Sequence, residues 1–188
     1  MVTAAKPKSA VAGAVHVAPI GTTLPTTADG ALDQAFIGLG YNTEDGLTRS
    51  VEKDTEIVKA WGGDVVLVLD NGKTETFKFS MLDAHSTAAL KLLNGDDNVS
   101  GTALATGISV TSNNKEQSAH AFVIDMIEQG NTLHRVVIPK GIVTEIEDIT
   151  YVDNDALAYG ITLTALADSE NNTVYEYYKT ASASASGT

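Results

Sequence analysis

Histidine is the side chain best suited to bind a metal or move a proton near neutral pH, and this chain contains four histidines. No two have the HxH or HxxxH spacing that places paired ligands on one strand or helix face: His16, His85, His120 and His134. His120 and His134 flank one expected hairpin and could be cross-strand neighbours, but no third ligand accompanies them. We therefore expect surface or structural histidines and no metal site.

Acidic turns and glycines are the next candidates for binding. Asp96-Asp97-Asn98 and Asp153-Asn154-Asp155 could attract calcium, but both lack the spacing and the terminal glutamate of an EF-hand loop. Gly38-Leu39-Gly40 matches only part of a dinucleotide fingerprint, and no GxGxxG with a following helix is present. These stretches predict ordinary turns and no cofactor.

The sequence spacings typical of catalytic residues are also missing. The chain has no GxSxG elbow, and no spacing ties its serine, histidine and aspartate residues together. Glu145 and Glu147 share a strand face and could serve a glycosidase, but a solvated face is the commoner role of such a pair. Trp61 and the Tyr175/Tyr177/Tyr178 cluster could stack on sugars, yet core or interface packing is commoner for aromatics at this spacing. We expect that the protein is not an enzyme.

The amino-acid composition limits the classes of molecule that the protein could bind. The 188 residues include no cysteine, and 24 acidic residues against 12 Lys and Arg give a net charge of −12. No Lys or Arg lies between Lys140 and Lys179, where eight acids occur. Proteins that bind nucleic acid carry clustered basic residues. The chain should therefore repel DNA, which still allows a surface past which DNA slides.

The chain is expected to form one domain. Unbroken apolar runs reach about five residues, far below the roughly 20 that span a bilayer, so no membrane contact is expected. Residues 1–12 are predicted to form a flexible arm, and residues 13–180 to form the domain. The Ala/Ser repeat at 181–188 is expected to be a disordered tail.

Most of the chain has the periodicity of strands, with strands expected at 14–19, 36–41, 65–69, 74–80, 120–128, 132–139, 141–151, 156–167 and 173–179. Asn71-Gly72 is a preferred centre of a type I′ turn, which predicts a hairpin that joins 65–69 to 74–80. The β-branched run Val65–Leu69 could be buried on both faces. Leu47–Trp61 is either an exposed strand or a long extended loop.

One helix is expected, at Asp83–Leu93. Asp83 is suited to cap its N-terminus, Gly95 to end it, and an apolar stripe to pack it on the sheet: Ala89, Leu92 and Leu93. Many short strands with a single helix predict a mainly β fold, a β-sandwich with one flanking α-helix.

Four stretches carry a family resemblance in the same order along the chain: residues 13–25 (GAVHVAPIGTTLP), 39–48 (LGYNTEDGLT), 56–64 (EIVKAWGGD) and 136–145 (VVIPKGIVTE). The chain resembles the major tail tube proteins of long, non-contractile-tailed (siphovirus-type) bacteriophages. None of the stretches is a chemical motif, so the specificity lies in the ordered set.

The resemblance implies a tail-tube-type β-sandwich or barrel that assembles into hexameric rings, which stack into a tube. It implies an acidic lumen that conducts the DNA genome during ejection without specific binding. The implied partners are other copies of the chain, the tape measure protein, the tail terminator and the distal tail or baseplate proteins. The implied location is the virion tail, assembled in the host cytoplasm.

Segment 42–63 resembles the family's extended loop, which reaches neighbouring subunits or rings. We expect inter-subunit contacts from its charged residues and its tryptophan: Arg49, Glu52, Lys53, Asp54, Glu56, Lys59 and Trp61. The alternative for the segment is an ordinary solvated hairpin. The alternatives for the protein are a virion decoration or receptor/carbohydrate-binding β-sandwich protein, and a hydrolase with an unrecognised site.

Overall fold

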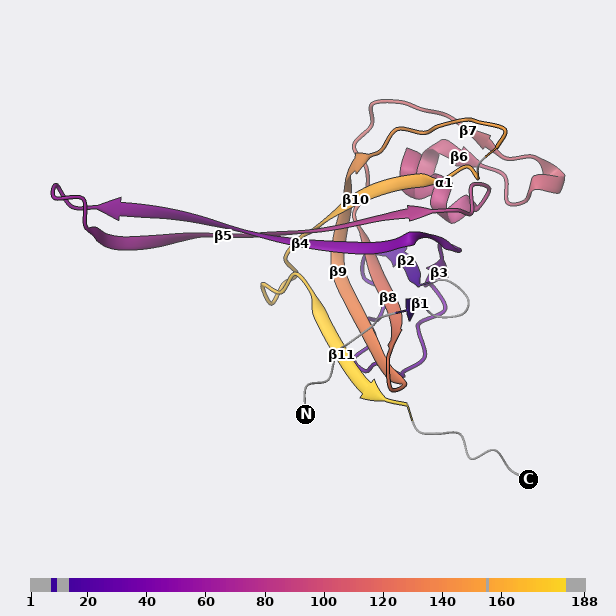
Figure 1. The fold of residues 1–188 in the computed structure, drawn as a ribbon. Helices are drawn as coiled ribbons and strands as arrows, with labels where there is room; N and C mark the ends of the chain where they lie inside the picture. The colour runs from indigo at the N-terminus through magenta and orange to yellow at the C-terminus, as the bar shows by residue number, and fades with distance from the viewer. Residues whose placement is uncertain (1–7, 10–13, 155, 182–188) are drawn as a thin grey trace, which may run out of the picture.

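The computed structural model describes residues 8–9, 14–154 and 156–181. Within this part most of the regular structure is strand, with one α-helix and two short 3₁₀ turns (Figure 1). The elements are, in order, β1 (Lys8–Ser9), β2 (Val15–Pro19), β3 (Ile37–Gly38), β4 (Asn42–Lys59), β5 (Val65–Met81), α1 (Thr87–Asn94), η1 (Asp96–Asn98), β6 (Val99–Ser100), η2 (Leu104–Thr106), β7 (Ser109–Val110), β8 (His120–Glu128), β9 (Thr132–Ile146), β10 (Tyr159–Ala165) and β11 (Tyr175–Thr180). The predicted mainly β fold with one flanking helix is confirmed.

Nine of these strands form one sheet. Its order is β3-β2-β8-β9-β10-β5-β4, with β1 added to β8 and β11 added to β9. The sheet bends around a core but does not close on itself within the described residues, because β3 and β4 stand at its two ends. The other two described strands, β6 and β7, pair only with each other.

Strand β9 holds the two halves of the sheet together. Its first half pairs with β8 on one side and with β11 on the other, and its second half pairs with β10. The sequence predicts two strands here, but the structure has one that continues through Pro139. The β8–β9 register shifts near this proline, which has no N–H to donate to a ladder. Gly141 lets the strand pass close to Phe122, because a Cβ atom there would lie 2.9 Å from the aromatic ring.

The main core lies between the bent sheet and α1. Alternate residues of five strands point into it, and they meet the three buried residues of the helix: Val15, Val17, Phe77, Phe79, Met81, Phe122, Ile124, Val136, Ile138, Ile161, Leu163, Ala89, Leu92 and Leu93. The predicted apolar stripe of the helix is therefore confirmed. A smaller apolar cluster on the opposite face includes Phe36, Val123 and Val137.

The C-terminal end of the helix agrees with the sequence-based prediction, but its N-terminal end does not. Gly95 ends α1 as expected, with a φ of 95° and its N–H donating to the carbonyl of Lys91 at 2.7 Å. The predicted N-cap is wrong: Ser86 occupies that position, and its hydroxyl accepts from the N–H of Ala89 at 3.5 Å. Asp83 lies three residues earlier, in the turn that follows β5.

The two predicted hairpins have different outcomes. The β8–β9 hairpin is confirmed, with residues 129–131 as its loop and positive φ angles at Gly130 and Asn131. The turn predicted at Asn71-Gly72 is wrong, because both residues lie inside the continuous strand β5. The strand expected at 36–41 is also shorter than predicted and comprises only Ile37–Gly38.

The predicted termini fall largely outside the described residues. Of the N-terminal arm, the structure describes only Lys8–Ser9, which pairs with β8. Residues 182–188 of the expected tail are not described. The division into arm, domain and tail stays a prediction.

Candidate assembly surface

The largest surface feature is a two-stranded ribbon that β4 and β5 form as they leave the body of the protein (Figure 1). At its root β5 contributes Phe77, Phe79 and Met81 to the core. From Thr74 out to Val65 every residue of β5 is exposed, and so is its partner strand. We call residues 50–74 the arm and residues 55–70 the distal arm.

The arm is long because β4 and β5 pair along most of their length, with register shifts at Asp54/Thr55 and Val58/Lys59. The register runs from Leu47 opposite Phe79 to Lys59 opposite Val65. Residues 60–64 form the turn, in which the N–H of Ala60 donates to the carbonyl of Asp64 at 2.8 Å. Gly63 adopts a φ of 90° there, a conformation that favours glycine.

The Asn71-Gly72 pair forms a bulge in this ribbon. The pairing changes from Asp54 opposite Gly72 to Thr55 opposite Asp70, which leaves Asn71 as the extra residue. Gly72 has a φ of 118°, and its N–H donates to the carboxylate of Asp70 at 3.0 Å. The glycine therefore supplies the expected positive φ, but for a bulge and not for a turn.

Both faces of the distal arm carry exposed apolar side chains. Residues directly opposite each other in an antiparallel pair lie on the same face, so Ile57 and Val68 share one face. Val58, Leu67 and Leu69 lie on the other, and all five are between 39% and 57% exposed. The sequence suggested burial of Val65–Leu69 on both faces, but the single chain leaves this run exposed. Exposed apolar surface of this kind is typical of sites that interact with another molecule.

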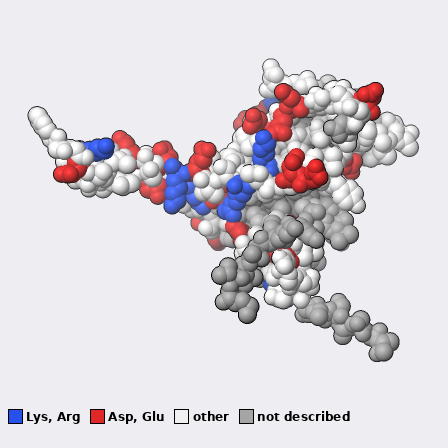
Figure 2. Space-filling model, viewed as in Figure 1, with Lys and Arg blue, Asp and Glu red and all other residues white. Residues whose placement is uncertain are grey.

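The predicted contact residues occupy three positions on this surface. Arg49 lies at the root and Trp61 at the tip, where the indole is 107% exposed. The other five lie on the exposed part of β4: Glu52, Lys53, Asp54, Glu56 and Lys59. Figure 2 shows acidic and basic side chains distributed along the arm. Whether these seven residues contact another subunit stays a prediction.

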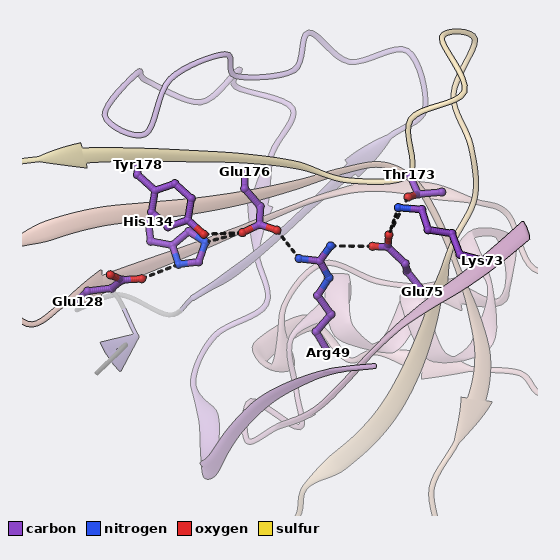
Figure 3. A network of polar contacts seen from close by, with 8 residues as sticks. All are labelled: Arg49, Lys73, Glu75, Glu128, His134, Thr173, Glu176 and Tyr178. Carbon is purple, nitrogen blue, oxygen red and sulfur yellow. Dashed lines mark hydrogen bonds and ion pairs between the residues drawn. The ribbon is translucent and has the colours of Figure 1, made fainter. Parts of the chain in front are cut away.

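At the root, Arg49 is engaged inside the chain. Its guanidinium forms ion pairs with Glu75, at 2.9 Å, and with Glu176 of β11 (Figure 3). Glu75 is 1% exposed and also accepts from Lys73 and from the hydroxyl of Thr173, the latter at 3.2 Å. Burial raises the pKa of Glu75, but the hydrogen bonds from Lys73 and Arg49 outweigh burial and leave that pKa below its usual value.

The network continues from Glu176 onto the body. Tyr178 donates to Glu176 at 2.6 Å, which raises the pKa of that tyrosine to about 12. The ring of His134 lies 3.3 Å from the same carboxylate and 3.0 Å from Glu128, and it stacks on the ring of Tyr178. Residues of β4, β5, β8, β9 and β11 are thus joined at the point where the arm leaves the sheet (Figure 3).

The sequence did not identify most of this network. The sequence pattern indicates Arg49, but its partner Glu176 is 127 residues away, and no local pattern indicates such a pair. Tyr178 stands out only as part of an aromatic cluster. The local signal for the arm is the apolar run Val65–Leu69, which is typical of a strand that is covered on both faces.

The lowered pKa of Glu75 predicts a specific acid sensitivity. Because the folded state holds this carboxylate ionised, its stabilising effect is present above the unfolded pKa and is lost as the pH falls through the folded pKa. We expect Glu75→Gln to be less stable than the wild type at pH 7. The free energies of unfolding of the two proteins, measured in urea, should converge as the pH falls below the ordinary pKa of a glutamate. Curves that stay parallel as the pH falls would show that Lys73 and Arg49 do not lower the pKa of Glu75.

The candidate metal ligands do not come together. His120 is at the start of β8, whereas His134 is opposite Met126 near the other end of that strand, so the expected neighbourhood of the two histidines is wrong. Among the residues that the structure describes, no group of three or more His, Cys, Asp or Glu side chains could hold a metal ion. The described helices include none that is long and apolar enough to cross a membrane.

The fold and the arm define a mainly β protein with a long, exposed and partly apolar hairpin. The family described as "Phage tail tube protein" matches residues 6–187, so the chain belongs to this family. It is therefore a structural component of a virion tail and not an enzyme. No curated protein sequence matches the chain.

Two solved structures are similar at low identity. The cap that terminates the tube of the anti-feeding prophage gives a TM-score of 0.45 at 10% identity, over 93% of this chain and 92% of that one. The sheath–tube complex of an extracellular contractile injection system (PVC), in its extended state, gives 0.48 at 10% identity over 90% of both chains.

Proposed function

We propose that this chain is the repeating subunit of the tail tube of a siphovirus-type phage. Copies form hexameric rings in the host cytoplasm, and the rings stack into a tube whose acidic lumen conducts the DNA genome during ejection. The net charge of −12 supports this proposal, because an acidic wall offers DNA no basic cluster to bind. The tape measure, terminator and distal tail or baseplate proteins are the further partners.

The observation that carries the proposal is the exposed distal arm. Its apolar side chains gain stability only if another molecule covers both faces of the ribbon, and a neighbouring copy in the tube provides that cover. The charged side chains along β4 then give the contact its register, since opposite charges across an interface select the correct alignment more than they add affinity. The predicted contact residues from Glu52 to Lys59 lie where this selection occurs.

Replacement of residues 56–69 by an Asn-Gly turn tests the proposal. This change keeps the Thr55–Asp70 pair, the bulge and the Arg49–Glu75 ion pair at the root. We expect a folded monomer with an unchanged melting temperature that forms no tubes in negative-stain electron microscopy, under conditions in which the wild type polymerises.

Two results would contradict the proposal. Tubes of wild-type length from the shortened variant would show that the distal arm does not join the copies. A wild-type chain that stays monomeric at every concentration and salt condition would favour the decoration or receptor-binding alternative. Circular dichroism of the shortened variant serves as the control that separates lost assembly from lost folding.

A further inference from the structure

A surface groove lies between α1 and the β2–β3 edge of the sheet. It has a volume of about 150 Å³ and is lined mainly by apolar side chains, which include Val17 and Pro19 from β2, Ile37 from β3 and Ala88 and Leu92 from α1. Ile37 is 58% exposed. The described part of the chain therefore leaves an apolar hollow open at the surface.

Charged side chains also line this groove. They are Lys91 of α1 and Asp96 of η1, together with His120 at the start of β8. The Asp96 carboxylate lies 3.2 Å from the Nε2 of His120. A mainly apolar lining with one positive and one negative side chain suits a ligand that is mainly apolar and carries both charges.

The tip of the arm has this composition. Trp61 is 107% exposed, and it lies between Lys59 at the end of β4 and Asp64 just before β5. An engineered protein cavity of about 150 Å³ accepts a benzene ring, so a groove of this volume can receive part of an aromatic side chain. Tryptophan is among the residues enriched at the energetic centres of protein interfaces.

The tip cannot fill the groove of its own chain. Figure 1 shows the β4–β5 turn at the far end of the ribbon, on the side of the molecule away from α1. Any contact between the two must therefore join separate molecules.

We propose that Trp61 at the arm tip of one copy docks in the α1–β2 groove of a second copy, with Lys59 facing Asp96 and Asp64 facing Lys91. This inference rests on the proposed function, in which the arm joins copies of the chain, and it names the surface that receives the arm.

The geometry of such a contact fits an open assembly. The tip and the groove are different surfaces of one molecule, so the contact is heterologous. A heterologous contact produces a closed ring when its rotation closes and a continuing filament when it does not. When the contact joins one ring to the next, each added ring presents a new set of tips or grooves, and the tube can continue to grow.

Cysteine cross-linking tests the contact directly, because the chain has no cysteine of its own. Gly62→Cys introduces a thiol beside Trp61, where a Cβ atom meets only the end of Asp64 at 3.9 Å. Tagged Lys91→Cys introduces one at the groove. We expect a short bismaleimide to join the two variants into a mixed dimer of distinct mass when they are co-assembled. The matched control is tagged Leu104→Cys, which is 63% exposed but does not line the groove, and it should give no mixed dimer.

The outcomes separate this inference from the proposed function. Tubes that form without a Gly62–Lys91 cross-link, or with an equal yield at position 104, would overturn the groove contact and leave the tube subunit intact. Absence of tubes from the wild-type chain would instead count against the proposed function. A cross-link of Gly62→Cys to a different tail protein in virions, and not to position 91, would also overturn the contact.

Charge reversal provides an independent test. Asp64→Lys and Lys91→Glu should each raise the concentration needed for assembly by about tenfold, since each places like charges together across the contact. The double variant should recover most of the loss. If the two single effects simply add, Asp64 and Lys91 do not face each other and the proposed orientation is wrong.

Discussion

Arg135→Met is expected to lower the free energy of unfolding by about 3 kcal/mol, because it removes one partner of a largely buried ion pair. Arg135 is 6% exposed. Its guanidinium donates to both carboxylate oxygens of Asp125, at 2.6 and 3.0 Å, and to the carbonyls of Thr27 and Gly30. Methionine fills a similar volume but donates to none of them, so a partly buried carboxylate and two loop carbonyls lose their partner.

The same loop offers a matched control. Lys179 forms an ion pair with Asp29, which lies between the two carbonyls that Arg135 holds, but both of its members are substantially exposed, at 53% and 40%. Exposed pairs contribute about 0–1 kcal/mol, so Lys179→Met should change stability little. Urea unfolding at pH 7 measures both variants. Equal losses in the two would show that burial does not strengthen the Arg135 contacts.

Local signals predicted the elements whose partners lie close in sequence. The β8–β9 hairpin, the helix around Ala89 and Leu92 and its end at Gly95 follow from periodicity and glycine, and the structure has all three. These features depend on a few consecutive residues, which is the range that such patterns describe. The β9 strand shows the limit, because Pro139 predicts a strand end, whereas pairing with β8 on both sides of the proline and with β10 beyond it continues the strand.

The arm shows why other features could not be predicted. Two glycine-containing stretches, Gly62-Gly63 and Asn71-Gly72, can each adopt a turn, and local preference favours the second. The pairing between β4 and β5 determines which stretch forms the turn, because a turn at residues 60–64 lets β4 pair with β5 from Leu47 to Lys59. A turn at 71–72 would leave most of β4 without this partner. A choice that depends on so many pairs at once is not visible in a window of a few residues.

The candidate site contains one local signal and one network that has none. The apolar run at Val65–Leu69 predicts burial on both faces, but in the single chain these five residues are exposed. The ion-pair network at the root of the arm has no such local signal, because most of its contacts join residues that are far apart in the sequence. Glu75 accepts from Lys73, its near neighbour on β5, but also from Arg49 and Thr173, which are 26 and 98 residues away and reach it only after folding.

The double substitution Ile57→Thr with Val68→Thr is expected to raise the critical concentration for tube formation by roughly 100-fold while leaving the monomer unchanged. The two residues lie directly opposite each other on one face of the distal arm and are 53% and 57% exposed. Threonine keeps a β-branched shape suited to strands, and changes at exposed positions alter stability by about 0.5 kcal/mol or less.

The large effect arises only in the assembly. Burial of two aliphatic side chains contributes about 3 kcal/mol, and roughly two powers of ten in association follow from that energy. Sedimentation of polymer at graded concentrations measures the shift, and urea unfolding of the dilute monomer measures the fold. Tyr151→Thr with Val152→Thr is the matched control, since it removes exposed apolar side chains outside the arm, 76% and 51% exposed. Equal shifts in both double variants would mean that general surface hydrophobicity, and not the face formed by Ile57 and Val68, controls assembly. A selective shift would show that this subunit folds through its own core but polymerises through an apolar ribbon that only a neighbour can cover.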